Sequence, residues 1–170
     1  MDEALQVILE MNEVVWTRLK RDLADVGPDE VNWRPVPEAN TINLIVRHLR
    51  IDAAWHVMKI EHQDHHERQD SRTSSESPPL DFEANLRELD GLWSRLLGRL
   101  RESSFAELER QTEAAYRGSP QGAAPPRFLG YHLALHTTGH GAQIRTIRNL
   151  YRKTRGEPAR FFPDNSTFPT

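Results

Sequence analysis

Residues 131–151 read YHLALHTTGHGAQIRTIRNLY, and this stretch decides how the rest of the chain is interpreted. Its three histidines, His132, His136 and His140, are spaced four residues apart, so they lie on one face of a helix. The other residues predicted on that face are Leu129, Gln143, Ile147 and Leu150. Because most of these are apolar, the face points to a core, and the imidazoles occupy positions where packing favours leucine.

Three further segments repeat apolar residues with a helical period of about 3.6. The predicted helices run from about Asp2 to Asp25, from about Thr41 to His66, from a cap at Asp81 to about Leu100, and from about Arg127 to Arg155. Four amphipathic helices predict an all-α four-helix bundle, folded as a single domain over residues 1–170.

The connecting segments differ in length and composition. Residues 68–79, RQDSRTSSESPP, predict a long, loose connection between the second and third helices. Residues 105–109, FAELE, predict one short helical turn before an irregular segment that ends at Pro126. The tail, residues 157–170, contains three Phe and three Pro, so we expect it to pack on the bundle.

Composition excludes several classes of protein. The 170 residues include no Cys, which excludes disulfides, thiolate zinc sites and a cysteine nucleophile. A formal net charge of -3 argues against nucleic acid as a partner. No apolar run approaches the roughly 20 residues that cross a membrane, and the acidic start does not resemble a signal peptide. We therefore expect a cytoplasmic protein whose metal ligands, if any, are imidazoles and carboxylates.

Two imidazoles one helical turn apart can bind the same metal ion, whereas three in a row cannot. A third ligand must come from another helix, and His48 lies on the apolar stripe of the second one. With His136 and His140 it would form an open site suited to Zn, Ni, Fe or Cu. Asp52, one turn beyond His48, is a candidate fourth ligand, hydrogen-bond partner of an imidazole, or base.

Other interpretations compete with this one. Buried histidines can simply be hydrogen-bonded in a core, and the His62–His66 pair fits a solvated helix end. We expect His56 and His65 to face solvent or a neighbouring helix. The chain contains no HExxH, Glu-x-x-His, GxGxxG, P-loop or GxSxG motif.

Two motifs resemble the DinB-like (YfiT-like) family. NWRPVPEANTINLIVRHL, residues 32–49, resembles the connector and second-helix start with the first metal histidine at His48. HTTGHGAQI, residues 136–144, resembles the last-helix motif, in which two histidines precede a glutamine. The resemblance implies that His48, His136 and His140 bind one divalent metal ion (Zn, Ni or Fe) and that His132 is a pocket or core residue. The family commonly has Arg-Gly where this chain has Gly141 and Ala142, so that arginine's role is missing here.

The resemblance also implies function. Some family members are thiol-dependent transferases or isomerases, and many are homodimers. We therefore expect a metal-dependent enzyme that activates a small cellular thiol or water for a small-molecule substrate. The alternatives are a metal-dependent hydrolase and a non-catalytic metal-binding bundle that acts in stress response or through a protein partner. Asp52 is the candidate catalytic carboxylate, and the candidate pocket residues are His132, Gln143, Trp55, Tyr116 and Arg117.

The first helix is apolar over more than one stripe, although one bundle core requires only one face. A symmetric homodimer would cover the second stripe.

Overall fold

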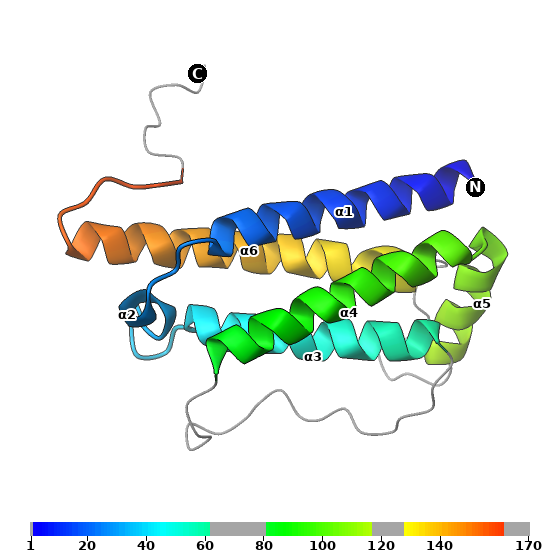
Figure 1. Ribbon diagram of the computed structural model, residues 1–170, viewed down its shortest axis with the longest axis horizontal. Helices are drawn as coiled ribbons and strands as arrows, with labels where there is room; N and C mark the ends of the chain where they lie inside the picture. Colours follow the sequence, from blue (N-terminus) through cyan, green and yellow to red (C-terminus); the bar gives the residue numbers. More distant parts are fainter. Residues whose placement is uncertain (1, 62–80, 117–127, 162–170) are drawn as a thin grey trace.

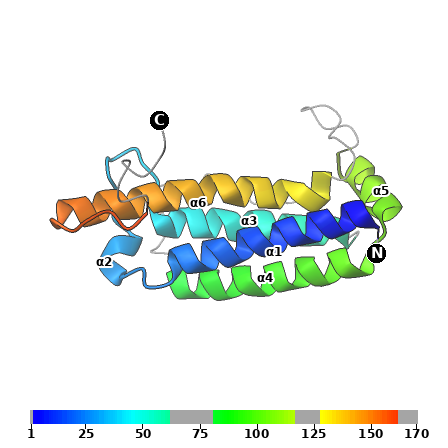
Figure 2. The same cartoon turned by 90° about the horizontal axis from the view of Figure 1, so that it is seen from above.

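Four long helices lie side by side and form the body of the protein (Figures 1 and 2). The computed structural model describes residues 2–61, 81–116 and 128–161. The long helices are α1 (Glu3–Leu23), α3 (Ile42–Ile60), α4 (Phe82–Glu102) and α6 (Phe128–Thr154), and the shorter ones are α2 (Pro28–Val31) and α5 (Phe105–Tyr116). The described ranges contain no strand, so the predicted all-α fold is confirmed.

The helices begin where side chains can cap them. The side chains of Asp2, Thr41 and Asp81 accept hydrogen bonds from the first-turn backbone amides of α1, α3 and α4. These bonds satisfy amides that have no partner within the helix. The predicted cap at Asp81 is therefore confirmed, and Thr41 rather than Asn40 caps α3.

The core lies along the inward stripes of the four long helices. Trp16 of α1 stacks on Trp93 of α4, with ring centroids 5.0 Å apart and planes 11° from parallel. Around this pair pack buried leucines and isoleucines from α1, α3, α4 and α6, including Leu5, Leu19, Ile45, Leu49, Leu89, Leu96, Leu129, Leu133 and Ile144. These side chains form one continuous core, and α3 contributes to it through the row of Ile45 and Leu49, whereas the row of His48 is only partly buried.

Three details differ from the sequence prediction. The short turn predicted at residues 105–109 is a helix of 12 residues, α5, because Leu108, Gln111 and Thr112 are buried at successive turns. The connector after α1 contains a short helix, α2, which Pro28 begins. Leu150 is exposed and the three histidines of α6 are only partly buried, because the buried face of this helix runs through Leu133, Thr137, Gly141 and Ile144, one residue further round than the predicted face.

The predicted C-terminal end of the second helix falls largely outside the described residues. The described part of the second predicted helix ends at Ile60, so its predicted extension to His66, with His62 and His65, lies outside the described residues. Within the described ranges, no helix is long and apolar enough to cross a membrane.

At the end of the bundle opposite α5, a buried arginine holds α6 against α1 and α2. Arg148 of α6 is 2% exposed and donates to Glu30 of α2 and to the backbone oxygen of Asp22 in α1. Asn149 accepts from the backbone amide of Phe161, and the Arg148 guanidinium lies 5.7 Å from that ring. The start of the tail therefore packs on the bundle as expected, while residues 162–170 lie outside the described part.

Replacing Arg148 with Ala should lower the free energy of unfolding by about 3–5 kcal/mol, because the buried Glu30 carboxylate loses its partner. Lys20→Ala is the control: its pair with Asp90 is half-exposed and should contribute less than about 1 kcal/mol. Urea unfolding measures both. Equal effects of the two substitutions would contradict the assignment, and Arg148→Met combined with Glu30→Leu should recover most of the loss.

Candidate metal centre

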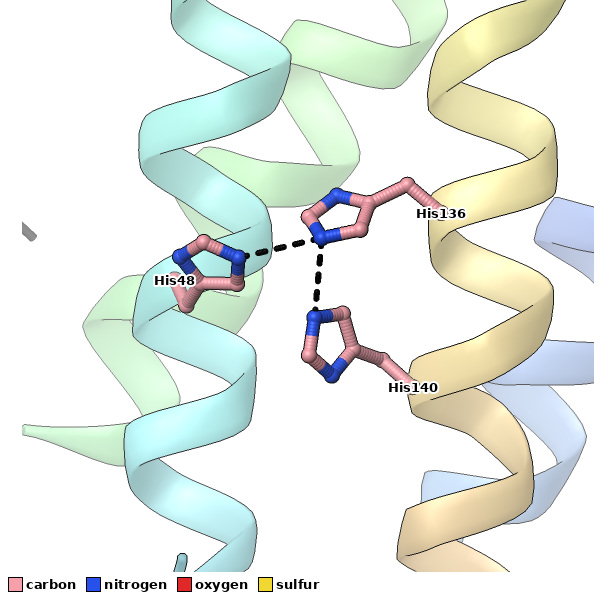
Figure 3. Close-up of side chains that lie close together, drawn as sticks. All are labelled: His48, His136 and His140. Atoms are coloured by element: carbon pink, nitrogen blue, oxygen red, sulfur yellow. Dashed lines mark hydrogen bonds between the residues drawn. The ribbon is translucent and has the colours of Figure 1, made fainter.

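Three imidazoles meet between α3 and α6 (Figure 3). His48 comes from α3, and His136 and His140 come from successive turns of α6. The Nε2 atom of His136 lies 3.2 Å from Nε2 of His48 and 3.0 Å from Nε2 of His140. The rings remain partly accessible, with 31% of the His48 side chain and 26% of the His136 side chain exposed. The structure thus brings together the three histidines that the sequence singled out.

The outer nitrogens of two rings face oxygen acceptors. His140 Nδ1 lies 3.0 Å from Oε1 of Gln143, and His136 Nδ1 lies 2.5 Å from Oδ2 of Asp52. The second contact is close but is not aligned as an ordinary hydrogen bond. A ring nitrogen that faces an oxygen acceptor carries the proton, so a neutral imidazole then has a bare lone pair on Nε2.

Two bare Nε2 atoms, those of His136 and His140, therefore face each other at 3.0 Å. Two lone pairs repel at this distance unless a proton or a cation lies between them. Ligand atoms that share one ion at about 2.0–2.1 Å lie roughly 2.8–3.4 Å apart in octahedral or tetrahedral geometry. The donor set and its spacing therefore fit a single metal ion. Among the described residues, these three histidines are the group that meets the geometric requirement.

Asp52 lies behind the imidazoles. Its carboxylate is also 3.8 Å from Nε2 of His48. Burial alone would raise the pKa of Asp52, but the contact with His136 and the nearby imidazoles of His48 and His56 lower it. The side chain is therefore a carboxylate at neutral pH, placed to orient His136. Of the three roles left open by the sequence, the geometry favours a partner of a ligating imidazole.

A second histidine pair, His56 and His132, lies next to the cluster and also joins α3 to α6. His56 Nδ1 lies 2.8 Å from the backbone oxygen of Asp52, and its Nε2 lies 3.1 Å from Nδ1 of His132. The His132 ring in turn stacks on His136, with centroids 5.7 Å apart. Spacing along the chain gave no sign of this pairing, because it depends on how α3 and α6 are aligned.

Burial shifts the pKa values of these imidazoles. His56 is 1% exposed, so it faces a neighbouring helix rather than solvent. Burial lowers its pKa to about 4, although the hydrogen bond to the Asp52 backbone acts in the opposite direction. Burial also lowers the pKa of His140, against the raising effect of its bond to Gln143. Both rings are therefore neutral at pH 7, as metal ligation requires of His140.

The remaining pocket candidates lie at different distances from the cluster. Gln143 contacts His140 directly, and His132 contacts His136 by stacking. Trp55 packs edge-on against His56, with centroids 4.9 Å apart, so it supports the second pair rather than the cluster. The side chain of Tyr116 and the whole of Arg117 lie outside the described residues.

The fold and this site define an all-α bundle with a three-histidine group able to hold one metal ion. The chain belongs to the DinB superfamily, whose family model matches residues 11–144. That range contains all three histidines, and it confirms the family assignment made from the two motifs. No curated protein and no solved structure matches the chain.

Acid should destabilise the metal-free protein through His56. Its pKa is about 4 when folded and about 6.5 when unfolded, so unfolding takes up a proton between these values. The free energy of unfolding should therefore fall as the pH drops from about 6.5 to about 4, by on the order of 3 kcal/mol from this residue.

Urea unfolding at a series of pH values, with a chelator present, measures this effect. His56→Phe removes the titrating group, so the variant should lose less stability than the wild-type protein over the same pH interval. An identical pH dependence in the two proteins would contradict the assignment.

Proposed function

We propose that the protein is a metal-dependent enzyme in which His48, His136 and His140 hold one divalent ion. The observation that carries this proposal is that three imidazoles meet at one point. The Nε2 atoms of His48 and His140 both lie within 3.2 Å of Nε2 of His136. Three protein ligands leave room for a further ligand from water or substrate. An ion bound there supplies Lewis acidity, which lowers the pKa of a thiol or a water molecule.

The surrounding residues then have definite roles. Gln143 accepts from the outer nitrogen of His140, and the Asp52 carboxylate faces the outer nitrogen of His136, so both help to direct the Nε2 lone pairs at one point. Asp52 is also the nearest carboxylate that could accept a proton from a bound thiol. A thiol requires little further proton handling, which favours thiol transfer or isomerisation over hydrolysis.

The two alternative functions are a metal-dependent hydrolase and a non-catalytic metal-binding bundle. Asp52 lies 3.8 Å from His48 Nε2, and a base at this position would also serve a metal-dependent hydrolase. A non-catalytic bundle, with the ion serving only stability or a protein partner, would leave no position for an exchangeable ligand. The partial exposure of the His48 and His136 side chains favours the enzyme.

The purified protein should bind about one divalent ion per chain. His48→Ala, His136→Ala and His140→Ala should each lower the affinity at least about 100-fold, because two imidazoles hold an ion poorly. His132→Ala should retain the metal, since this ring pairs with His56 instead. Elemental analysis and titration calorimetry measure the outcome. Full metal content in a His48→Ala/His140→Ala double variant would show that the site lies elsewhere.

Catalysis requires a separate test. The metal-loaded protein should transfer small cellular thiols to electrophilic substrates, or isomerise substrates in a thiol-dependent way, and lose this activity with a chelator. A screen that crosses several thiols with electrophiles, using His136→Ala as the control, tests the assignment. Ester or amide hydrolysis without any thiol would favour the hydrolase, and no turnover with full metal content would favour the non-catalytic bundle.

We also propose that α1 mediates a symmetric homodimer. Its outer face carries Val7 and Val14, whose exposed fractions are 59% and 48%. The acidic Glu3 precedes this apolar centre, and the basic Arg18 and Arg21 follow it. Antiparallel packing of two α1 helices would cover the valines and place the acidic end of each helix beside the basic end of the other.

Sedimentation at micromolar concentration should show a dimer for the wild-type chain. Val7→Glu combined with Val14→Glu should give a monomer, because it buries two carboxylates at the contact. Val36→Glu alters an equally exposed valine in the connector and should leave the dimer intact. A monomeric wild-type protein, or a dimeric double variant, would contradict the proposal.

A further inference from the structure

A groove lies beside the imidazole cluster and shares one residue with it. Gln143, which accepts from His140, also lines this groove of about 380 Å³. The groove lies between α6 and the residues just before α3, and its other lining residues are Ala39, Asn40, Ala142, Thr146 and Ile147. Its volume is in the range of small-molecule sites. One glutamine thus belongs to both the imidazole cluster and the groove.

The groove is mainly apolar. Ala39, Ala142 and Ile147 have hydrocarbon side chains. The hydroxyl of Thr146 donates to the backbone oxygen of Ala142, so its hydrogen is already used within the helix. Gln143 and Asn40 contribute neutral amides, and no charged side chain lines the groove among the described residues. Such a surface favours hydrocarbon over charged or strongly hydrated groups.

We infer that this groove binds the apolar part of the substrate whose polar head lies at the imidazole cluster. The inference rests on the proposed function, since the cluster must first hold a metal ion and the head. It assigns a substrate class: a small molecule with a metal-binding head joined through a short spacer to an alkyl or aryl group. The head lies beside His140, and the apolar group lies one helical turn further along α6, against Ala142 and Thr146.

Two hydroxamates test this assignment because they share one metal-binding head. Acetohydroxamate carries only a methyl group, whereas 4-phenylbutanohydroxamate carries an aryl tail. Titration calorimetry on the metal-loaded protein should show at least about tenfold tighter binding of the tailed compound, since each buried methylene contributes about 0.8 kcal/mol. Metal content is measured on the same samples.

Ala142→Phe and Thr146→Phe fill the groove from exposed positions, so neither should disturb folding. Both should reduce the preference for the tailed compound to less than about threefold. Metal content and the affinity for acetohydroxamate should stay unchanged. Ala106→Phe is the matched control, because it places the same side chain at an exposed position of α5 and should keep the full preference.

Three results of this experiment would contradict the inference, and they can be told apart. Metal-loaded protein with no preference for the tail overturns the groove assignment and leaves the metal site standing. A preference that persists in both filled variants overturns it as well. Protein that binds no metal ion overturns the proposed function and this inference together, and the metal analysis identifies that case.

Discussion

The rest of the site depends on one constraint, which is that three imidazole nitrogens must meet at one point. Nε2 of His136 lies 3.2 Å from that of His48 and 3.0 Å from that of His140. Two of these come from one helix and are placed by its pitch, but the third comes from α3. The alignment of α3 against α6 therefore sets the geometry, and the leucine core on both helices fixes that alignment.

Four kinds of chemistry follow one another where α3 and its preceding residues pack against α6. The buried His56–His132 pair lies at one end, followed by Asp52 and the imidazole cluster, then Gln143, and finally the apolar groove. Burial favours the neutral form of an imidazole over its charged form. The low pKa of His56 and the lowered pKa of His140 express this preference. A bound cation would use the lone pairs that neutrality provides.

Much of this arrangement could be predicted from the sequence because it depends on local periodicity. The 3.6-residue stripes gave the four long helices, and the spacing of His136 and His140 gave two neighbouring imidazoles. Features that depend on packing between helices could not be read in this way. The pairing of His56 with His132 is one example, since it requires the register of α3 against α6. The length of α5 is another, because tertiary burial of Leu108 and Thr112 extends it beyond its local signal.

X-ray absorption spectroscopy of the metal-loaded protein tests the central claim most directly, because it counts the atoms around the ion. The ion should have three imidazole nitrogens at about 2.0–2.1 Å. It should also have at least one light-atom ligand that an added thiol replaces with sulfur. A shell with one imidazole or none, or one with no position that a thiol can enter, would contradict it.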